Sequence, residues 1–235
     1  MSLKNSHSQN LIKEFSLLAL LACISLPSYA IEAYQATYTA NIKSGLSFSG
    51  TLKRSLSKAS NGQWLFQDKI SSMLASIEES SNLTMDNNQI LPHKYHYLRK
   101  VLGKKKKRDI DFDWSKKTAV DRDKTSFSLP LGTQDSLSYQ LQLQLDLQRG
   151  VRGNFSYPIA KRGAISNIKF VQVGREVIDT PMGKIDTIKL KLDRGADAKR
   201  VTYIWFSIKH NFVITALQQT EADGKSYSIV LKKLS

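Results

Sequence analysis

The sequence predicts a mainly β protein: a curved antiparallel sheet or open β-barrel with one packed α-helix, preceded by a cleavable signal helix. Three observations predict this class. Segments rich in Tyr, Thr, Val and Ile, with polar and apolar residues in rough alternation, recur from residue 34 to residue 233. Turn sequences containing Gly, Asn and Asp separate these segments. Only residues 135–149 carry good helix signals, so about eleven strands are expected around one helix.

The chain begins with the layout of a secretory signal peptide, residues 1–30. A polar start with two lysines precedes an almost unbroken apolar run at 15–26, and small side chains lead to Ala30. This run is too short to cross a hydrocarbon core, which needs about 20 residues. We therefore expect cleavage after Ala30, export to the periplasm of a Gram-negative bacterium, and a single β-rich periplasmic domain at 31–235.

The only cysteine, Cys23, lies inside this signal segment. The predicted mature domain therefore has no thiol, which excludes disulfides, cysteine nucleophiles and thiolate metal sites from it. Residues 20–23 also resemble a lipoprotein cleavage box, so lipid anchoring through Cys23 is an alternative. The apolar run continues past Cys23 to Leu26, and the bulky Leu21 stands where such boxes have a small residue. Both features favour cleavage after Ala30.

The first part of the mature chain predicts a series of strands. Residues 34–42 and 46–52 alternate on either side of Gly45, which indicates a hairpin. The other elements expected before residue 103 are a turn at 57–62, a strand from Trp64, a strand at 70–80, a turn at 86–88 and a strand at 94–102.

A run of five basic residues after Gly103 is the most unusual local feature of the chain. It consists of Lys104, Lys105, Lys106, Lys107 and Arg108. We interpret the run as a solvated hairpin tip, because strand-like sequence lies on both sides and lysines at a tip or edge oppose aggregation. Contact with an anionic lipid or glycan surface is the alternative, since clustered lysines gain about 1 kcal/mol each there. A turn with a short strand is expected at 115–123.

Asp109, Asp111 and Asp113 follow on alternate positions and would lie on one face of a strand. Calcium needs roughly six to eight oxygens and usually a glycine-containing loop, and this segment supplies neither. We therefore interpret the three aspartates as charge partners of the adjacent lysines. No metal and no cofactor is expected.

Residues 135–149 fit two patterns. Leucine and polar residues alternate as in a strand, while three of the leucines also follow the four-residue spacing of a helix. Asp135 can cap the start of a helix and Gly150 can end it, and the segment has no β-branched residue. Gln and Leu favour helix intrinsically, so we predict the helix.

The last third of the chain again predicts strands. Residues 179–183 and 222–224 are turn sequences flanked by extended residues, which indicates two antiparallel hairpins. The expected strands are 165–173, 176–179, 184–192, 200–208, 212–220 and 225–233.

The composition is strongly basic. Lys and Arg number 35 against 20 Asp and Glu, which gives a formal net charge of +15. Such a surface attracts polyanions. The polyanions available to an exported chain are phospholipid head groups, lipopolysaccharide phosphates and acidic glycans, so we expect one of these as partner, possible peripheral membrane contact, and no nucleic acid.

No residue pattern specifies a reaction. The mature chain has three histidines, His93, His96 and His210, and it has no nucleophile elbow, zinc-helix motif, phosphate loop or dinucleotide fingerprint. An enzyme is therefore not expected. A hydrolase is the alternative, and it requires one of these histidines to lie beside a carboxylate and a hydroxyl.

Several aromatic residues are candidates for ligand contact in a curved sheet. They are Trp64, Trp114, Trp205, Tyr95 and Tyr97. The alternative is that they fill the inside of the sheet as core residues.

Motifs spread over residues 34–232 resemble the bacterial exported family called domain of unknown function 3108. They are Leu91-Pro92-x-x-Tyr95-x-Tyr97-x-Arg99, Phe112-Asp113-Trp114, Asp135-x-Leu137-Ser138, Val173-Gly174-x-Glu176-x-Ile178-x-Thr180-Pro181-x-Gly183, Trp205 and Asp223-Gly224-x-x-Tyr227. The resemblance implies a periplasmic β-rich protein and supports the helix, and it brings no catalytic residues. The chain departs from the family pattern after Trp205, where Lys209-His210-Asn211 replaces an acidic residue and a proline.

These observations together predict a non-catalytic envelope protein that binds an amphiphile such as a lipid, or an anionic glycan. The alternatives are a cell-envelope hydrolase and a structural or assembly partner of another envelope protein. The sequence predicts no oligomeric state.

Overall fold

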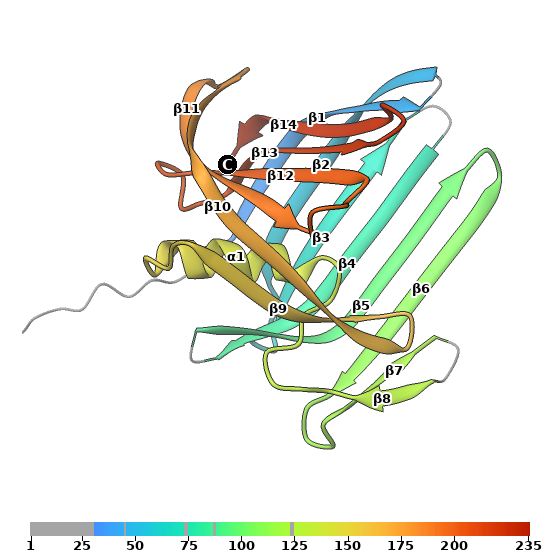
Figure 1. Ribbon diagram of the computed structural model, residues 1–235. Coiled ribbons are helices and arrows are strands. Elements are labelled where there is room, and N and C mark those ends of the chain that lie inside the picture. Colours follow the sequence, from blue (N-terminus) through green and yellow to red (C-terminus); the bar gives the residue numbers. More distant parts are fainter. Residues whose placement is uncertain (1–30, 45, 73–74, 87, 123–124) are drawn as a thin grey trace, which may run out of the picture.

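The computed structural model describes residues 31–235, except 45, 73–74, 87 and 123–124 (Figure 1). The signal segment, its cleavage site after Ala30 and Cys23 lie outside the described residues, so those expectations remain predictions.

Fourteen strands form a single antiparallel sheet. In chain order the elements are β1 (Tyr34–Ser44), β2 (Leu46–Lys58), β3 (Trp64–Ser71), β4 (Ala75–Asp86), β5 (Gln89–Val101), β6 (Lys104–Asp113), β7 (Thr118–Asp121), β8 (Ser126–Ser128), α1 (Ser138–Gln148), β9 (Asn154–Lys161), β10 (Ala164–Thr180), β11 (Gly183–Asp193), β12 (Arg200–Ser207), β13 (Ile214–Glu221) and β14 (Ser226–Leu234). The sheet curves around α1 and does not close into a barrel (Figure 1). The predicted fold class is confirmed.

The strand order is β8-β7-β6-β5-β4-β3-β2-β1-β14-β13-β12-β11-β10-β9. Because β1 pairs with β14, the first and last strands lie in the middle of the sheet, and β8 and β9 are its edges. The two edges approach each other at what we call the seam. There Gln134, in the segment between β8 and α1, pairs with β9. The Gln134 N–H donates to the Pro158 carbonyl at 2.8 Å, and the Ala160 N–H donates to the Gln134 carbonyl at 2.9 Å.

The helix α1 lies on the concave face and is surrounded by apolar side chains. Leu143 and Leu147 pack in one core cluster, while Leu141 and Leu145 pack in the other. The alternation of Leu and Gln therefore reflects a helix enclosed on several sides. The buried glutamines are satisfied by main-chain groups: Gln142 Oε1, for example, accepts from the Ile90 N–H at 2.7 Å. Among the described residues, no helix has the length and apolar character needed to cross a membrane.

The helix α1 begins at Ser138 rather than at residue 135 and ends at Gln148. The two residues expected to cap it, Asp135 and Gly150, flank it on either side. Asp135 Oδ1 accepts from the N–H groups of Leu137 and Ser138 at 2.8 and 2.7 Å, just where α1 begins. Gly150 follows the helix with φ of 85°, and its N–H donates to the Leu147 carbonyl.

The helix occupies one end of the curved sheet, and hairpin turns line the other end (Figure 1). We call this other end the open end. It is defined by the turns at 102–103, 162–163 and 222–225. The face that carries α1 is the concave face, and the opposite face is the convex face.

The basic run is not a hairpin tip, and that expectation is wrong. The turn between β5 and β6 consists of Leu102 and Gly103, whose φ angles are 47° and 77°. Two positive φ angles are typical of a two-residue hairpin turn, so pairing resumes at once, with Lys104 opposite Val101. The run therefore lies along β6.

Several strand boundaries also differ from expectation. β2 continues to Lys58 rather than ending at residue 52, and β5 begins at Gln89 rather than at residue 94. Residues 70–80 contain a turn, closed by Ser72, whose Oγ lies 3.2 Å from both the N–H and the carbonyl of Ala75. Residues 165–173 and 176–179 belong to one strand, β10, because a bulge at Gly174 shifts the register without ending the pairing with β11. β13 begins at Ile214 rather than at residue 212.

The strands β8 and β9 were not expected. β9 contains Pro158, which argues against an interior strand and is tolerated here because β9 is an edge strand. The hairpins at 44–46, 179–183 and 222–224 are confirmed.

Candidate functional site: a basic cleft at the seam

The strand β6 divides its basic residues between the two faces of the sheet. Residues two apart on a strand point the same way, so the even-numbered residues lie on the concave face with the buried Ile110. The concave basic residues are Lys104, Lys106 and Arg108, and the convex ones are Lys105 and Lys107.

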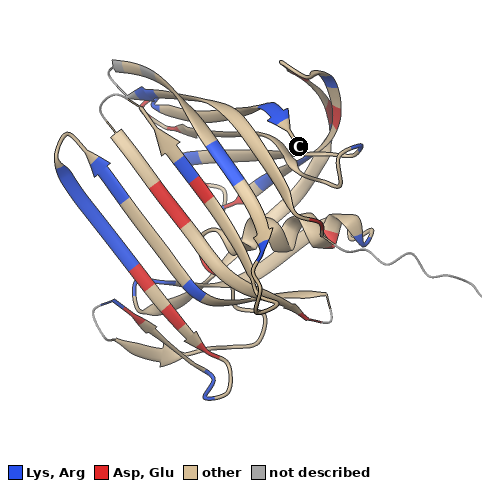
Figure 2. Ribbon diagram, turned by 180° about the vertical axis from the view of Figure 1, so that it is seen from behind, with Lys and Arg blue, Asp and Glu red and all other residues tan. Residues whose placement is uncertain are grey.

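The convex face provides a carboxylate for one of its two lysines, Lys107, while Lys105 has none within 4.0 Å among the described residues. Asp109 Oδ2 lies 2.9 Å from Lys107 Nζ, and Asp109 Oδ1 lies 2.6 Å from His96 Nδ1. Partial burial opposes ionisation of Asp109, but the hydrogen bonds from Lys107 and His96 outweigh it and lower the pKa of this carboxyl. In Figure 2, β6 carries a continuous blue block followed by red bands that are separated by tan.

The other two aspartates pair outside the run. Asp111 Oδ1 is 4.0 Å from Lys94 Nζ, and Asp113 Oδ2 is 3.2 Å from Lys116 Nζ. The interpretation of the three aspartates as charge partners of the adjacent lysines is therefore confirmed only for Asp109. Within the described ranges, no three His, Cys, Asp or Glu side chains gather as metal ligands.

The concave basic groups of β6 face cations from the opposite edge of the sheet. Burial and the positive charges of Arg108, Arg162 and Arg194 lower the pKa of Lys161, the last residue of β9. The charge of Glu79 opposes this shift. Among these four cations, each arginine therefore lies close enough to Lys161 to repel it. In the part of the chain that the structure describes, none of them has a carboxylate within 4.0 Å.

A cleft of about 200 Å³ opens between these edges, and we call it the basic cleft. Its lining residues are Lys107, Arg108, Asp121, Arg122, Thr125, Arg162 and Gly163.

Asp121 connects the two walls of this cleft. Its Oδ2 accepts from the Gly163 N–H at 2.9 Å, and its Oδ1 accepts from the Arg122 N–H at 2.6 Å. Gly163 has φ of +71°, and a Cβ there would lie 3.1 Å from Thr125 Cγ2. The cleft therefore depends on a buried carboxylate and on a glycine that allows close approach.

Buried polar pairs lie on the concave face between α1 and the open end. Arg54 binds Asp68 with two hydrogen bonds of 2.7 and 2.6 Å and also donates to Gln140 Oε1 of α1 at 2.8 Å. The Tyr95 hydroxyl donates to Glu79 Oε1 at 2.6 Å. Burial raises the pKa of Glu79 to about 8.

Nearer the open end the concave face is apolar. Ile70 and Ile77 are cross-strand neighbours, and both are half-buried. With Ala40, Ile42 and Ala75 they line a shallow depression of about 30 Å³. An apolar strip therefore adjoins the concave cations.

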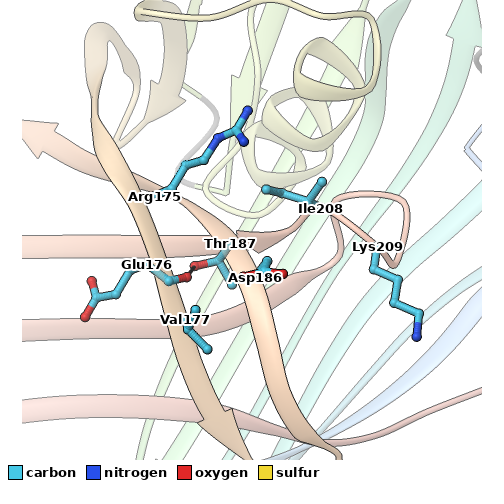
Figure 3. A pocket seen from close by; sticks show the side chains of 7 residues that line it. All are labelled: Arg175, Glu176, Val177, Asp186, Thr187, Ile208 and Lys209. Carbon is cyan, nitrogen blue, oxygen red and sulfur yellow. Dashed lines mark hydrogen bonds between the residues drawn. The ribbon is translucent and has the colours of Figure 1, made fainter.

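The β10–β11 hairpin extends beyond its neighbouring strands over residues 173–186, and we call this part the β10–β11 arm. A larger pocket of about 510 Å³ lies at the base of the arm (Figure 3). The lining residues are Arg175, Glu176, Val177, Asp186, Thr187, Ile208 and Lys209. One of the two carboxylates in this lining already has partners, since Glu176 Oε2 lies 2.9 Å from both Lys189 Nζ and Trp205 Nε1.

The five candidate aromatics do not form one cluster. Tyr95 is buried in the core, and Tyr97 lies on the same face beside Arg108. Trp64 and Trp114 pack against the same core cluster, and Trp114 Nε1 donates to the Pro92 carbonyl at 2.8 Å.

Trp205 lies apart from the other four candidates, on the convex side of β12. Its ring packs near Tyr203, and its indole N–H contacts Glu176. Two separate elements of the family resemblance, the Gly-x-Glu segment and Trp205, are thus in direct contact.

The three histidines lie at separate places. His93 Nε2 contacts Thr84 Oγ1 at 2.9 Å, and His96 contacts Asp109. His210 Nδ1 lies 2.9 Å from Ser207 Oγ, and that hydroxyl belongs to a fully buried residue. None of the three has both a hydroxyl and a carboxylate partner among the described residues.

Sequence reasoning singled out one wall of the basic cleft and missed the other. Lys161 and Arg162 are neighbours in sequence, but both lie far from the basic run, and Arg194 lies further still along the chain. Only the strand order, which makes β9 an edge of the sheet, could have identified Lys161 and Arg162.

Comparisons with known proteins agree with the fold. The model of the family described as "Protein of unknown function (DUF3108)" matches residues 37–232. A β-barrel-like protein of domain of unknown function DUF1849 from Brucella abortus is 10% identical, with 86% of this chain and 97% of that chain covered and a TM-score of 0.53. At this identity the similarity shows the fold alone.

A more distant structure is a putative outer membrane lipoprotein-sorting protein domain from Vibrio parahaemolyticus. It is 10% identical, with 86% of this chain and 84% of that chain covered, and the TM-score is only 0.31. No curated protein matches the chain.

Proposed function

The chain belongs to the DUF3108 family of proteins of unknown function, and we propose that it binds an anionic amphiphile of the bacterial envelope at its open end, without chemical turnover. The observation that carries this proposal is the row of concave cations without ion-pair partners beside an apolar strip. The place of action is the periplasm, and this part of the proposal rests on the signal segment.

The charges favour an anionic ligand. On β6, Lys107 has a carboxylate partner on the convex face, whereas Lys104, Lys106 and Arg108 have none within 4.0 Å among the described residues. Cations that repel one another are stabilised by a bound anion.

The apolar strip favours an acyl chain over a purely polar glycan. Ile70, Ile77 and Ile42 are half-buried although the sheet curves around them, and no described element covers them as α1 covers the other end. Burial of an apolar chain on this strip is favourable by about 25 cal/mol for each Å² removed from water. The depression is shallow, so the chain would lie along the strip.

Substitution of the strip tests this proposal. We expect the Ile70→Gln, Ile77→Gln double variant to bind lysophosphatidylglycerol at least about tenfold more weakly, because two apolar contacts become polar. Displacement of a fluorescent fatty acid, below the critical micelle concentration, measures the affinity. The control is Val171→Gln, Val173→Gln on the exposed convex side of β10, which keeps wild-type affinity. Absence of displacement from the wild-type protein would contradict the proposal.

One observation favours a second function, assembly with another envelope protein. Val173 and Val177 on the β10–β11 arm are 47% and 54% exposed, and Met182 at its tip is 39% exposed. Exposed apolar side chains around a pocket mark protein contact surfaces. A photo-crosslinker at Val177 should capture one defined partner in cells, and a crosslinker at Val120 on β7 should not. Equal or no capture at the two positions would remove this candidate.

A further inference from the structure

We propose that the basic cleft is a phosphate-binding site, and that it holds the phosphate group of the amphiphile. This inference rests on the proposed function for the lipid part of the ligand, but the phosphate site itself stands on the geometry of the cleft.

The side chains of the cleft suit a phosphate group. Arg108, Arg122 and Arg162 line it from three different segments, and Thr125 adds a hydroxyl group. A guanidinium presents several N–H donors in a plane, which matches two oxygens of a phosphate at once.

The one carboxylate among the described lining residues does not compete for this role. Both oxygens of Asp121 accept main-chain N–H groups, those of Arg122 and Gly163. Asp121 therefore shapes the cleft and leaves the arginine side chains free of an ion pair, since no described carboxylate lies within 4.0 Å of them.

The electrostatics of the seam favour an anion with more than one charge. Arg108, Arg162 and Arg194 face Lys161, whose pKa is lowered by burial and by these neighbours. A phosphate monoester carries close to two negative charges at neutral pH and can contact both walls. Binding should therefore draw the two edges of the sheet together and raise the thermal stability of the protein.

The cleft and the apolar strip lie within reach of a single molecule. Lys106 is opposite Arg99 on β5, Arg99 is opposite Ile77 on β4, and Ile77 is opposite Ile70 on β3. Neighbouring strands are about 4.8 Å apart, so the strip begins about 10 Å from β6. An acyl chain can span this distance while its phosphate stays in the cleft.

The test compares dodecyl phosphate, dodecyl phosphocholine and inorganic phosphate, at pH 7.5 and constant ionic strength, by calorimetry and thermal unfolding. We expect dodecyl phosphate to bind at least about tenfold more tightly than dodecyl phosphocholine. The Arg108→Gln, Arg162→Gln double variant should reduce this preference to less than about threefold. Lys105→Gln, on the convex face of the same strand, should leave it unchanged.

The outcomes separate this inference from the proposed function. Equal binding of both amphiphiles, unaffected by the double variant, overturns the phosphate site and leaves amphiphile binding intact. If inorganic phosphate binds as tightly as dodecyl phosphate and the double variant no longer binds it, the phosphate site is supported. The proposal that the phosphate belongs to a lipid is then overturned. Absence of any binding overturns both.

Discussion

Replacement of Arg54 by alanine is expected to lower the free energy of unfolding by about 3–5 kcal/mol. The Arg54 side chain is only 3% exposed, and its guanidinium binds both oxygens of Asp68. It also donates to Gln140 of α1 and lies over the ring of Phe66, 5.0 Å from the centroid. The truncation leaves the Asp68 carboxylate buried without its cation, and this uncompensated charge accounts for most of the cost.

Chemical denaturation measures this effect. The neighbouring Lys53→Ala, on the exposed convex face of the same strand, is the control and should change stability by less than about 0.5 kcal/mol. The double variant Arg54→Met, Asp68→Leu removes both charges and should recover most of the loss. A loss below about 1 kcal/mol in Arg54→Ala would show that the pair is not the main link between β2, β3 and α1.

Much of this fold could be predicted because its signals are local. The alternation of polar and apolar residues marks most strands, and glycine-containing turns mark the hairpins at 179–183 and 222–224. The turn that begins at Ser72 could not be recognised, because residues 72–75 include no Gly, Pro or Asn. The strand β9 could not be predicted because its proline is tolerated only at an edge, and edge position follows from the global strand order.

The candidate site could be predicted only in part, for the same reason. The basic run was identifiable from sequence, but its division between the convex face, where Lys107 pairs with Asp109, and the concave face depends on the register of β6. A hairpin turn one residue longer would exchange the two faces. The partners of the run across the seam come from residues about 50 to 90 positions later, and only the meander of antiparallel strands brings them there.

The alternating segment at 135–149 shows how tertiary context resolves an ambiguous pattern. Its leucines face both core clusters, and its glutamines meet loop carbonyls and N–H groups inside the curved sheet. An amphipathic helix would have shown one apolar face. A helix enclosed by a sheet needs apolar residues all round, so the strand-like alternation is compatible with helix here.

The second large effect is a pH-dependent gain of stability when Glu79 is replaced by glutamine. Burial, together with the negative charges of Asp68 and Asp135, raises the pKa of Glu79 to about 8, although its hydrogen bond with Tyr95 opposes the shift. A raised pKa in the folded state stabilises the protein at low pH, and this contribution is lost as the pH rises from about 4.5 to about 8. Each pH unit in this range costs about 1.4 kcal/mol at most.

Glutamine has the shape of the protonated side chain and carries no charge. We therefore expect Glu79→Gln to match the wild-type stability near pH 4 and to exceed it by about 2–4 kcal/mol at pH 8, in denaturation curves measured across this range. The adjacent Glu78→Gln, exposed on the convex face, is the control and should differ from wild type by less than about 0.5 kcal/mol at either pH. A difference between Glu79→Gln and wild type that does not grow with pH would mean that Glu79 is ionised in the folded protein. The polar pairs beneath the open end would then carry one more negative charge, and this charge would weaken the attraction of the concave face for an anion.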